Sequence, residues 1–222
     1  MAIFNTVYGG EPKWKPNANT IAYYPLTSST TTSDIKWWYN LTVWHSSPTF
    51  WTYQWVDCAK FNGSNNDLYN NSLNPWAYGH QFTISLYAYF WWWSTAILIW
   101  NVYKTGSNYY NFSLWKNPNA SYINMEWVNF WTISTNSWWW HNLVVTCNER
   151  AVTTYVNWVQ QNTGTLWLSL SNNWVWRLWV TEDGWNYYYY FNGWLSNVIV
   201  ENKIWTSTEV SNYYNQTKWL YS

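Results

Sequence analysis

Short segments rich in β-branched and aromatic residues recur along this chain, separated by clusters of Asn, Gly and Ser. In the clearest segment, FTISLYAYF, the apolar residues Phe82, Ile84, Leu86 and Ala88 alternate along the chain, so they share one face of a strand. Many short strands at this spacing, with little helical periodicity, predict an all-β sandwich or barrel. The expected strands are 21–26, 41–44, 49–61, 81–90, 95–102, 109–115, 122–133, 141–147, 152–156, 166–170 and 195–201.

The two ends of the chain differ from its middle. Residues 1–20, rich in Gly, Pro and Asn, predict an extended lead-in. Residues 21–222 show no internal repeat or boundary, so a single domain is expected there. Near the C-terminus, Thr206 and Glu209 have the spacing of a capping box. We therefore expect a helix over about 207–215, with Val210 and Tyr214 on one face.

Tryptophan is abundant in this sequence and glycine is scarce. The 222 residues include 26 Trp and 8 Gly, whereas average usage predicts about 16 Gly. Trp158 follows Asn157, and Trp174 follows Asn173, at places where a hairpin turn favours Gly. Some bacteria, and viruses that infect them, read the codon UGA as glycine, whereas other codes read it as tryptophan. One hypothesis is that many of these tryptophans are glycine codons; the alternative is a truly Trp-rich adhesin.

Three stretches of the chain carry motifs of a known kind: FNGSNNDLY (61–69) with FTISLYAY (82–89), WHNLVVTC (140–147) with YVNW (155–158), and FNGWLSNVIVENKIWTSTEV (191–210). Together these motifs resemble the LamG-like jelly-roll family of the concanavalin A-like superfamily. They stand in the family's order and cover about residues 55–221. The resemblance implies a two-sheet antiparallel jelly-roll sandwich with one short C-terminal helix, and no particular function. Trp158 stands where the family has Gly, while Trp140 and Trp205 stand where it has an aromatic residue.

The resemblance also raises the question of a metal site. Members of the wider superfamily often bind calcium, and Ca²⁺ prefers several carboxylate ligands. The first stretch offers Asn62, Asn66 and Asp67 as candidate metal ligands, and only Asp67 is acidic. We therefore expect no cofactor, with calcium left open. Cys58 and Cys147 lie in apolar runs and are expected to be buried thiols, with a disulfide as the alternative.

Charge is sparse and balanced, with ten basic and ten acidic residues. Because no basic stripe could neutralise phosphates, nucleic acid is not an expected partner. No apolar run approaches the roughly 20 residues of a membrane helix, so no membrane insertion is expected. No secretory signal is seen at the N-terminus, so we expect the protein on the extracellular face or in a virus particle, reached by another route. Near-zero net charge leaves self-association open.

The acidic residues do not form a catalytic pattern. Glucanases of the same superfamily carry paired carboxylates in an E-x-D-x-x-E pattern, as retaining hydrolysis requires, and this sequence has no such pattern. Glu182 and Asp183 are adjacent, so they would face opposite sides of a strand, and Glu126 stands alone. The three histidines show no spacing typical of metal ligands. We therefore expect that the protein is not an enzyme.

Aromatic rings combined with Asn and Ser side chains suit sugars, which present apolar faces and hydroxyl groups. The main hypothesis is a non-catalytic recognition module for a glycan, or for a cell-envelope or surface partner. The alternatives are a structural or decoration protein of a virus particle or surface layer and, less favoured, a glycoside hydrolase. The candidate ligand-binding residues are Tyr109, Tyr110, Tyr187, Tyr188, Tyr189, Tyr190, Trp91, Trp92 and Trp93.

Overall fold

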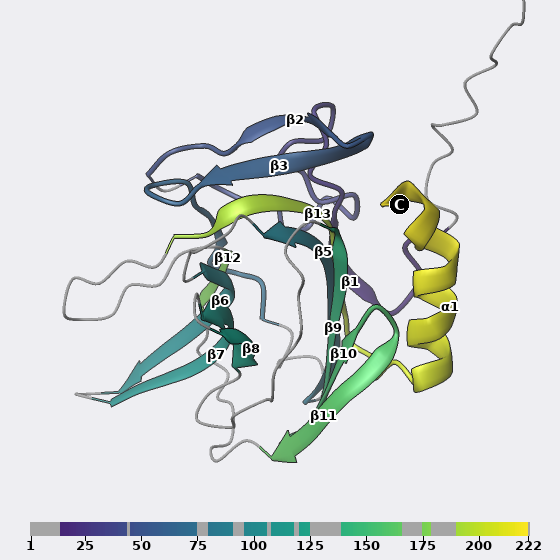
Figure 1. The fold of residues 1–222 in the computed structure, drawn as a ribbon. Coiled ribbons are helices and arrows are strands. Elements are labelled where there is room, and N and C mark those ends of the chain that lie inside the picture. The colour runs from purple at the N-terminus through teal and green to yellow at the C-terminus, as the bar shows by residue number, and fades with distance from the viewer. Residues whose placement is uncertain are drawn as a thin grey trace, which may run out of the picture.

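The described strands form two antiparallel sheets with one α-helix near the C-terminus, which confirms the all-β sandwich (Figure 1). The computed structural model describes residues 14–43, 45–74, 80–90, 96–105, 108–117, 120–124, 139–165, 175–178 and 190–221, with the backbone alone for 96–105, 108–117, 120–124 and 175–178.

The larger sheet has eight strands, in the order β11-β10-β9-β5-β13-β3-β2, with β1 also paired to β13. Its strands are β1 (Thr20–Tyr24), β2 (Thr49–Tyr53), β3 (Val56–Asn62), β5 (Gln81–Phe90), β9 (His141–Asn148), β10 (Ala151–Val156), β11 (Val159–Thr165) and β13 (Asn192–Glu201). Along one edge of β13, residues 192–195 pair with β3 and residues 198–201 pair with β1. Between these two parts, Ser196 Oγ donates to the carbonyl oxygens of Asp57 (3.0 Å) and Pro25 (3.4 Å). Both neighbouring strands are thereby tied to β13.

The smaller sheet has five strands, in the order β4-β12-β6-β7-β8. Its strands are β4 (Leu68–Asn70), β6 (Ala96–Thr105), β7 (Asn108–Asn117), β8 (Ala120–Asn124) and β12 (Val175–Leu178). Figure 1 shows this sheet on one side of the larger sheet and helix α1 (Ser207–Thr217) on the other. A short 3₁₀ helix, η2 (Lys218–Leu220), follows α1.

Two expected strands differ from the structure. Residues 41–43 form no strand, and Thr42 makes a single bridge to Tyr69. The segment expected as one strand over 49–61 is the β2–β3 hairpin, because Gln54 and Trp55 form a two-residue turn. That turn is invisible in the sequence because it lacks the Asn-Gly pair that marks such turns.

Three observed strands carry too little pattern to be predicted. β4 and β12 have only three and four residues, too few to show an alternation. β11, with the sequence VQQNTGT, is almost wholly polar and lies at one end of its sheet. The strand expected over 166–170, and residues 125–133 of the strand expected over 122–133, lie outside the described residues.

β5 is buried on both of its faces. The predicted inner face is confirmed, since Phe82, Ile84, Leu86 and Ala88 all belong to one buried hydrophobic cluster. The opposite face carries Tyr87 and Tyr89, which belong to a second cluster. The other aromatic members of that second, outer cluster include Tyr23, Trp140, Tyr155, Trp194, Trp205, Tyr213 and Tyr221. Helix α1 contributes to this cluster, so the outer face of the sheet is covered where most sandwiches meet water.

Helix α1 begins where the capping box predicts. Thr206 Oγ1 accepts a hydrogen bond from Glu209 N at 3.2 Å, and Glu209 Oε2 accepts one from Thr206 N at 2.8 Å. The helix continues to Thr217, two residues beyond the expected end. Among the described residues, no helix is long and apolar enough to cross a bilayer.

The buried face of α1 differs by one residue from the expectation. Val210, Tyr213 and Thr217 are buried, whereas Tyr214 is half-buried. The spacings of three and four residues place these three side chains on one helical face. The Tyr213 ring lies 5.1 Å from the Trp205 ring and 6.2 Å from the Tyr87 ring.

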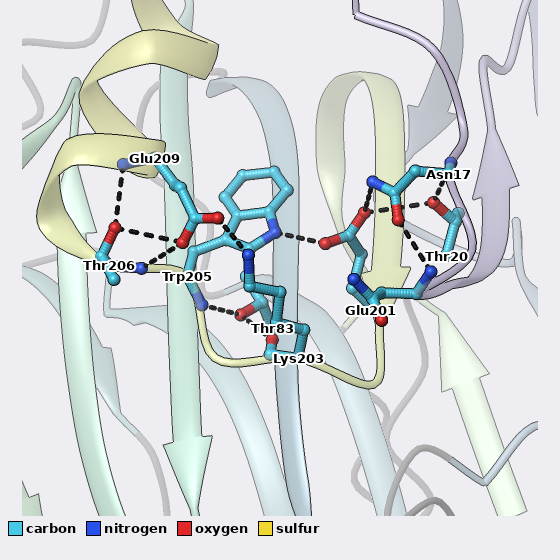
Figure 2. A network of polar contacts seen from close by, with 9 residues as sticks. Asn17, Thr20, Thr83, Glu201, Lys203, Trp205, Thr206 and Glu209 are labelled. Carbon is cyan, nitrogen blue, oxygen red and sulfur yellow. Dashed lines mark hydrogen bonds and ion pairs between the residues drawn. The ribbon is translucent and has the colours of Figure 1, made fainter.

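Polar contacts fasten the start of α1 to β5, β13 and the segment before β1 (Figure 2). The buried Glu201 carboxylate accepts hydrogen bonds from Asn17 Nδ2 (2.8 Å) and Thr20 Oγ1 (3.1 Å), and from Trp205 Nε1. The backbone N–H of Trp205 donates to Thr83 Oγ1 at 2.9 Å. The outer face is therefore held by hydrogen bonds as well as by ring packing.

The two cysteines are buried and free. Cys147 belongs to the inner cluster and Cys58 to the outer one, so the two thiols lie on opposite faces of the sheet. Burial raises the pKa of each thiol to about 12. Both are therefore protonated and unreactive near neutral pH.

Candidate functional site

The connection from β3 to β4 meets two other segments of the chain. We call the three segments together the His45 edge: residues 45–47, 62–67 and 190–192. Ser46 and Asn66 form a parallel bridge. The backbone N–H of Gly63 donates to the carbonyl of Phe191 at 2.9 Å. Residues more than 120 positions apart in the sequence are thus brought side by side.

The tight turn at the centre of this edge depends on Asn62 and Gly63. Asn62 Oδ1 accepts hydrogen bonds from the backbone N–H groups of Ser64 (3.0 Å), Asn65 (3.1 Å) and residue 66 (3.3 Å). Gly63 has φ 74°, and a Cβ there would lie 2.8 Å from Asn192 Cβ. Only glycine accepts both this backbone conformation and this close approach.

Two buried polar side chains form the floor of the His45 edge. Asn66 and Asp67 are 5% and 2% exposed. Asn66 Nδ2 donates to the carbonyl of Ser47 (2.9 Å) and to Ser46 Oγ (3.3 Å), while its Oδ1 accepts from Asn62 N (2.8 Å). Because buried polar groups are costly unless hydrogen-bonded, these contacts hold the two loops in one arrangement.

The Asp67 carboxylate holds His45 in place. Its Oδ1 accepts from the His45 backbone N–H at 2.9 Å, and its Oδ2 contacts His45 Nδ1. The Tyr190 ring meets the imidazole edge-on, with ring centroids 6.4 Å apart. An exposed imidazole is thus oriented by a buried carboxylate and an aromatic ring.

The exposed side chains around these two buried residues are mostly polar, and we call them the rim. Its exposed members are His45, Ser47, Asn62, Ser64 and Asn65, and Tyr190 is half-buried beside them. Together they present an imidazole, hydroxyl groups, amides and an aromatic ring. This set can exchange hydrogen bonds with hydroxyl groups and pack against an apolar ring face.

The three candidate metal ligands do come together here, as hydrogen-bond acceptors that shape the loop. Asn62, Asn66 and Asp67 each accept a backbone N–H through Oδ1. Within the described ranges, no group of three His, Cys, Asp or Glu side chains is placed to hold a metal. The expectation of no cofactor, with calcium left open at these three residues, stays a prediction.

Of the candidate ligand-binding residues, Tyr190 is the one whose side chain is described, and it lies at the His45 edge. Tyr109 and Tyr110 lie near the start of β7, opposite Lys104 and Tyr103 of β6. Trp91, Trp92, Trp93, Tyr187, Tyr188 and Tyr189 lie outside the described residues, as do Glu126, Glu182 and Asp183.

The sequence did not indicate four members of this edge, which are His45, Ser47, Ser64 and Asn65. His45 lies 22 positions from Asp67, and no short-range pattern links an exposed histidine to a remote carboxylate. A pairing of this kind depends on how the loops meet.

Comparison with known proteins identifies the fold. No family model and no curated protein matches the sequence. Domain 4 of AbnA, a GH43 extracellular arabinanase from Geobacillus stearothermophilus solved with arabinotriose, matches at TM-score 0.67 and 18% identity, over 88% of this chain and 98% of that one. Trypanosoma rangeli sialidase matches at TM-score 0.69 and 13% identity, over 92% of this chain and 34% of that one.

A third similar structure is the binding domain of botulinum neurotoxin DC, solved with rat synaptotagmin II. It matches at TM-score 0.61 and 15% identity, over 89% of this chain and 51% of that one. The chain thus spans about half of the toxin domain and a third of the sialidase. At these identities the likenesses show a β-sandwich fold.

Proposed function

We propose that this chain is a LamG-like recognition domain that binds a carbohydrate at the His45 edge without catalysing a reaction. The observation that carries the proposal is the pre-arranged rim around Asn66 and Asp67. Because buried hydrogen bonds already hold the loops, a ligand binding there would lose little free energy to loop ordering. Polar groups held in place beside an aromatic ring suit the hydroxyl groups and apolar faces of a sugar.

A neutral sugar fits this edge better than an acidic one. The loops 45–47, 62–67 and 190–192 contain no Lys or Arg, so these loops offer no permanent cation to a sugar carboxylate. The rim instead offers amides and hydroxyl groups. The structural likeness to an arabinanase domain solved with arabinotriose supports this ligand class.

The same loops support a binding role over glycoside hydrolysis. Hydrolysis requires two carboxyl groups flanking the scissile bond, and these loops contain one, Asp67. That carboxylate is buried and engaged with His45. The proposal also includes a location on a cell surface or a virus particle, because such a location fits the recognition of a glycan.

A glycan array followed by titration calorimetry tests the proposal, with arabinotriose as the first probe. Tyr190→Ala should weaken binding about tenfold, because it removes the aromatic surface of the rim. Tyr214→Ala, a half-buried tyrosine on α1, is the matched control and should leave the affinity unchanged. Equal effects of the two variants, or no saturable binding of any sugar, would reject the proposal in favour of a structural role or a protein partner.

A further inference from the structure

Two hairpin turns of the larger sheet end in a tryptophan with left-handed backbone. In the β10–β11 turn, Asn157 and Trp158 have φ 47° and 70°. In the β2–β3 turn, Gln54 and Trp55 have φ 48° and 68°. Positive φ at both central residues defines the type I′ turn, whose second position strongly favours glycine. A bulky aromatic side chain at that position is a steric outlier.

A third tryptophan has the same conformation in a different turn. Trp37 has φ 67°, and its backbone N–H donates to the carbonyl of Asp34 at 2.9 Å. The buried Asp34 carboxylate pins this turn, accepting from the backbone N–H groups of Lys36 (3.0 Å) and Tyr23 (2.9 Å). Asp at the first and Gly at the fourth position is the preferred composition of such a turn.

These three side chains contribute little to packing. Trp37, Trp55 and Trp158 are 80%, 90% and 49% exposed. The buried tryptophans Trp140 and Trp205 differ in both respects: each is 5% exposed, and neither has positive φ. Trp37, Trp55 and Trp158 thus combine positive φ with exposure, whereas Trp140 and Trp205 combine burial with an ordinary backbone conformation.

We infer that residues 37, 55 and 158 are glycine in the protein as its source makes it, because their codon is a UGA read there as glycine. Trp140 and Trp205, which fill the outer cluster, are genuine tryptophans encoded by UGG. The shortage of glycine, 8 in 222 residues, and the excess of tryptophan follow from the same cause. The three exposed indoles are then no part of any ligand-binding surface.

The direct test reads the five codons in the gene and measures the masses of the matching peptides from the native protein. We expect UGA and glycine at 37, 55 and 158, and UGG and tryptophan at 140 and 205. UGG codons at the three turns, or UGA codons that yield tryptophan, would overturn the inference. UGA at 140 and 205 as well would overturn the division by backbone conformation.

A second test uses the protein that carries tryptophan at every position where the sequence shows it, expressed in a host that translates it in this way. Trp55→Gly and Trp158→Gly should each raise the midpoint of thermal unfolding by about 2 to 8 °C, because left-handed backbone costs glycine nothing. Trp205→Gly, the matched control, should lower that midpoint by about 10 °C because it empties a buried site. A fall in the midpoint for both turn variants would contradict the inference.

Discussion

The outer face of the larger sheet and the His45 edge are built from different interactions. The outer face is aromatic: Tyr87 and Tyr221 stack in parallel with ring centroids 3.6 Å apart, and Tyr53 stacks on Trp194 at 4.0 Å. The His45 edge is polar, and its shape comes from hydrogen bonds to Asn62, Asn66 and Asp67. One region buries apolar area, and the other positions polar groups beside water.

If the His45 edge has the function proposed for it, this difference separates stability from recognition. Burial of an aromatic side chain stabilises the fold mainly through the apolar area that it removes from water, and this contribution has no preferred direction. A hydrogen bond contributes about 1 kcal/mol net, but it fixes direction. We therefore expect substitutions in the outer cluster to affect mainly folding, and substitutions at the His45 edge to affect mainly binding.

The largest effect is expected at the centre of the outer cluster. Tyr213→Ala removes a buried ring that packs on Trp205 and Tyr87, and should lower the free energy of unfolding by about 3–5 kcal/mol. Urea denaturation measures this change. Tyr214→Ala, the next residue on the same helix, should cost less than about 1 kcal/mol. Similar losses in the two variants would show that α1 does not seal the outer face as described.

An intermediate effect is expected at the floor of the His45 edge. Asp67→Asn keeps the shape of the side chain but removes the charge that holds His45, and should lower the free energy of unfolding by about 1–2 kcal/mol. Sugar affinity should fall more steeply, because the rim loses its fixed geometry. Titration calorimetry, with a sugar that binds the unchanged protein, measures the affinity. Urea denaturation measures the free energy of unfolding separately. An unchanged affinity would show that the edge is structural only.

The smallest effect is expected at the start of α1, and it depends on pH. Partial burial pushes the pKa of Glu209 up, but hydrogen bonds from Lys203 and Thr206 outweigh it and hold that pKa below its ordinary value. The hydrogen bond to Glu209 raises the pKa of Lys203. The stabilisation is therefore present above the ordinary pKa of a glutamate, 4.5, and is lost as pH falls through the lowered folded value. At the alkaline end it is lost as pH rises through the raised pKa of Lys203.

Glu209→Gln removes this charge while keeping a capping residue. Because both partners are partly exposed, it should lower the free energy of unfolding by about 0.5 kcal/mol at neutral pH and by less below pH 4. Thr206→Ala, which removes the cap, should cost about 1 kcal/mol across this range. Unfolding curves at several pH values compare the two. A Glu209→Gln loss that does not shrink in acid would rule out the ion pair as its source.

Local patterns predicted the parts of the fold that local physics determines. The alternation in β5 predicted its inner face, and the spacing of Thr206 and Glu209 predicted where α1 begins. The β2–β3 turn escaped prediction because Gln54 and Trp55 carry no turn signal. Of the candidate site, Asn62, Asn66, Asp67 and Tyr190 were named from sequence, while their assembly with His45 was not.

The class of fold could be predicted from the chain alone, because strand alternation and helix capping depend on residues within a few positions of one another. The tertiary structure was needed to show which distant segments meet. Asp67 contacts His45, and the His45 ring in turn meets Tyr190. The pairing of β3 with β13 brings the loops that carry Asp67 and Tyr190 to the same edge of the sheet. The tertiary structure also decided which tryptophans are strained, since φ at residues 37, 55 and 158 is set by the turns that the surrounding strands impose.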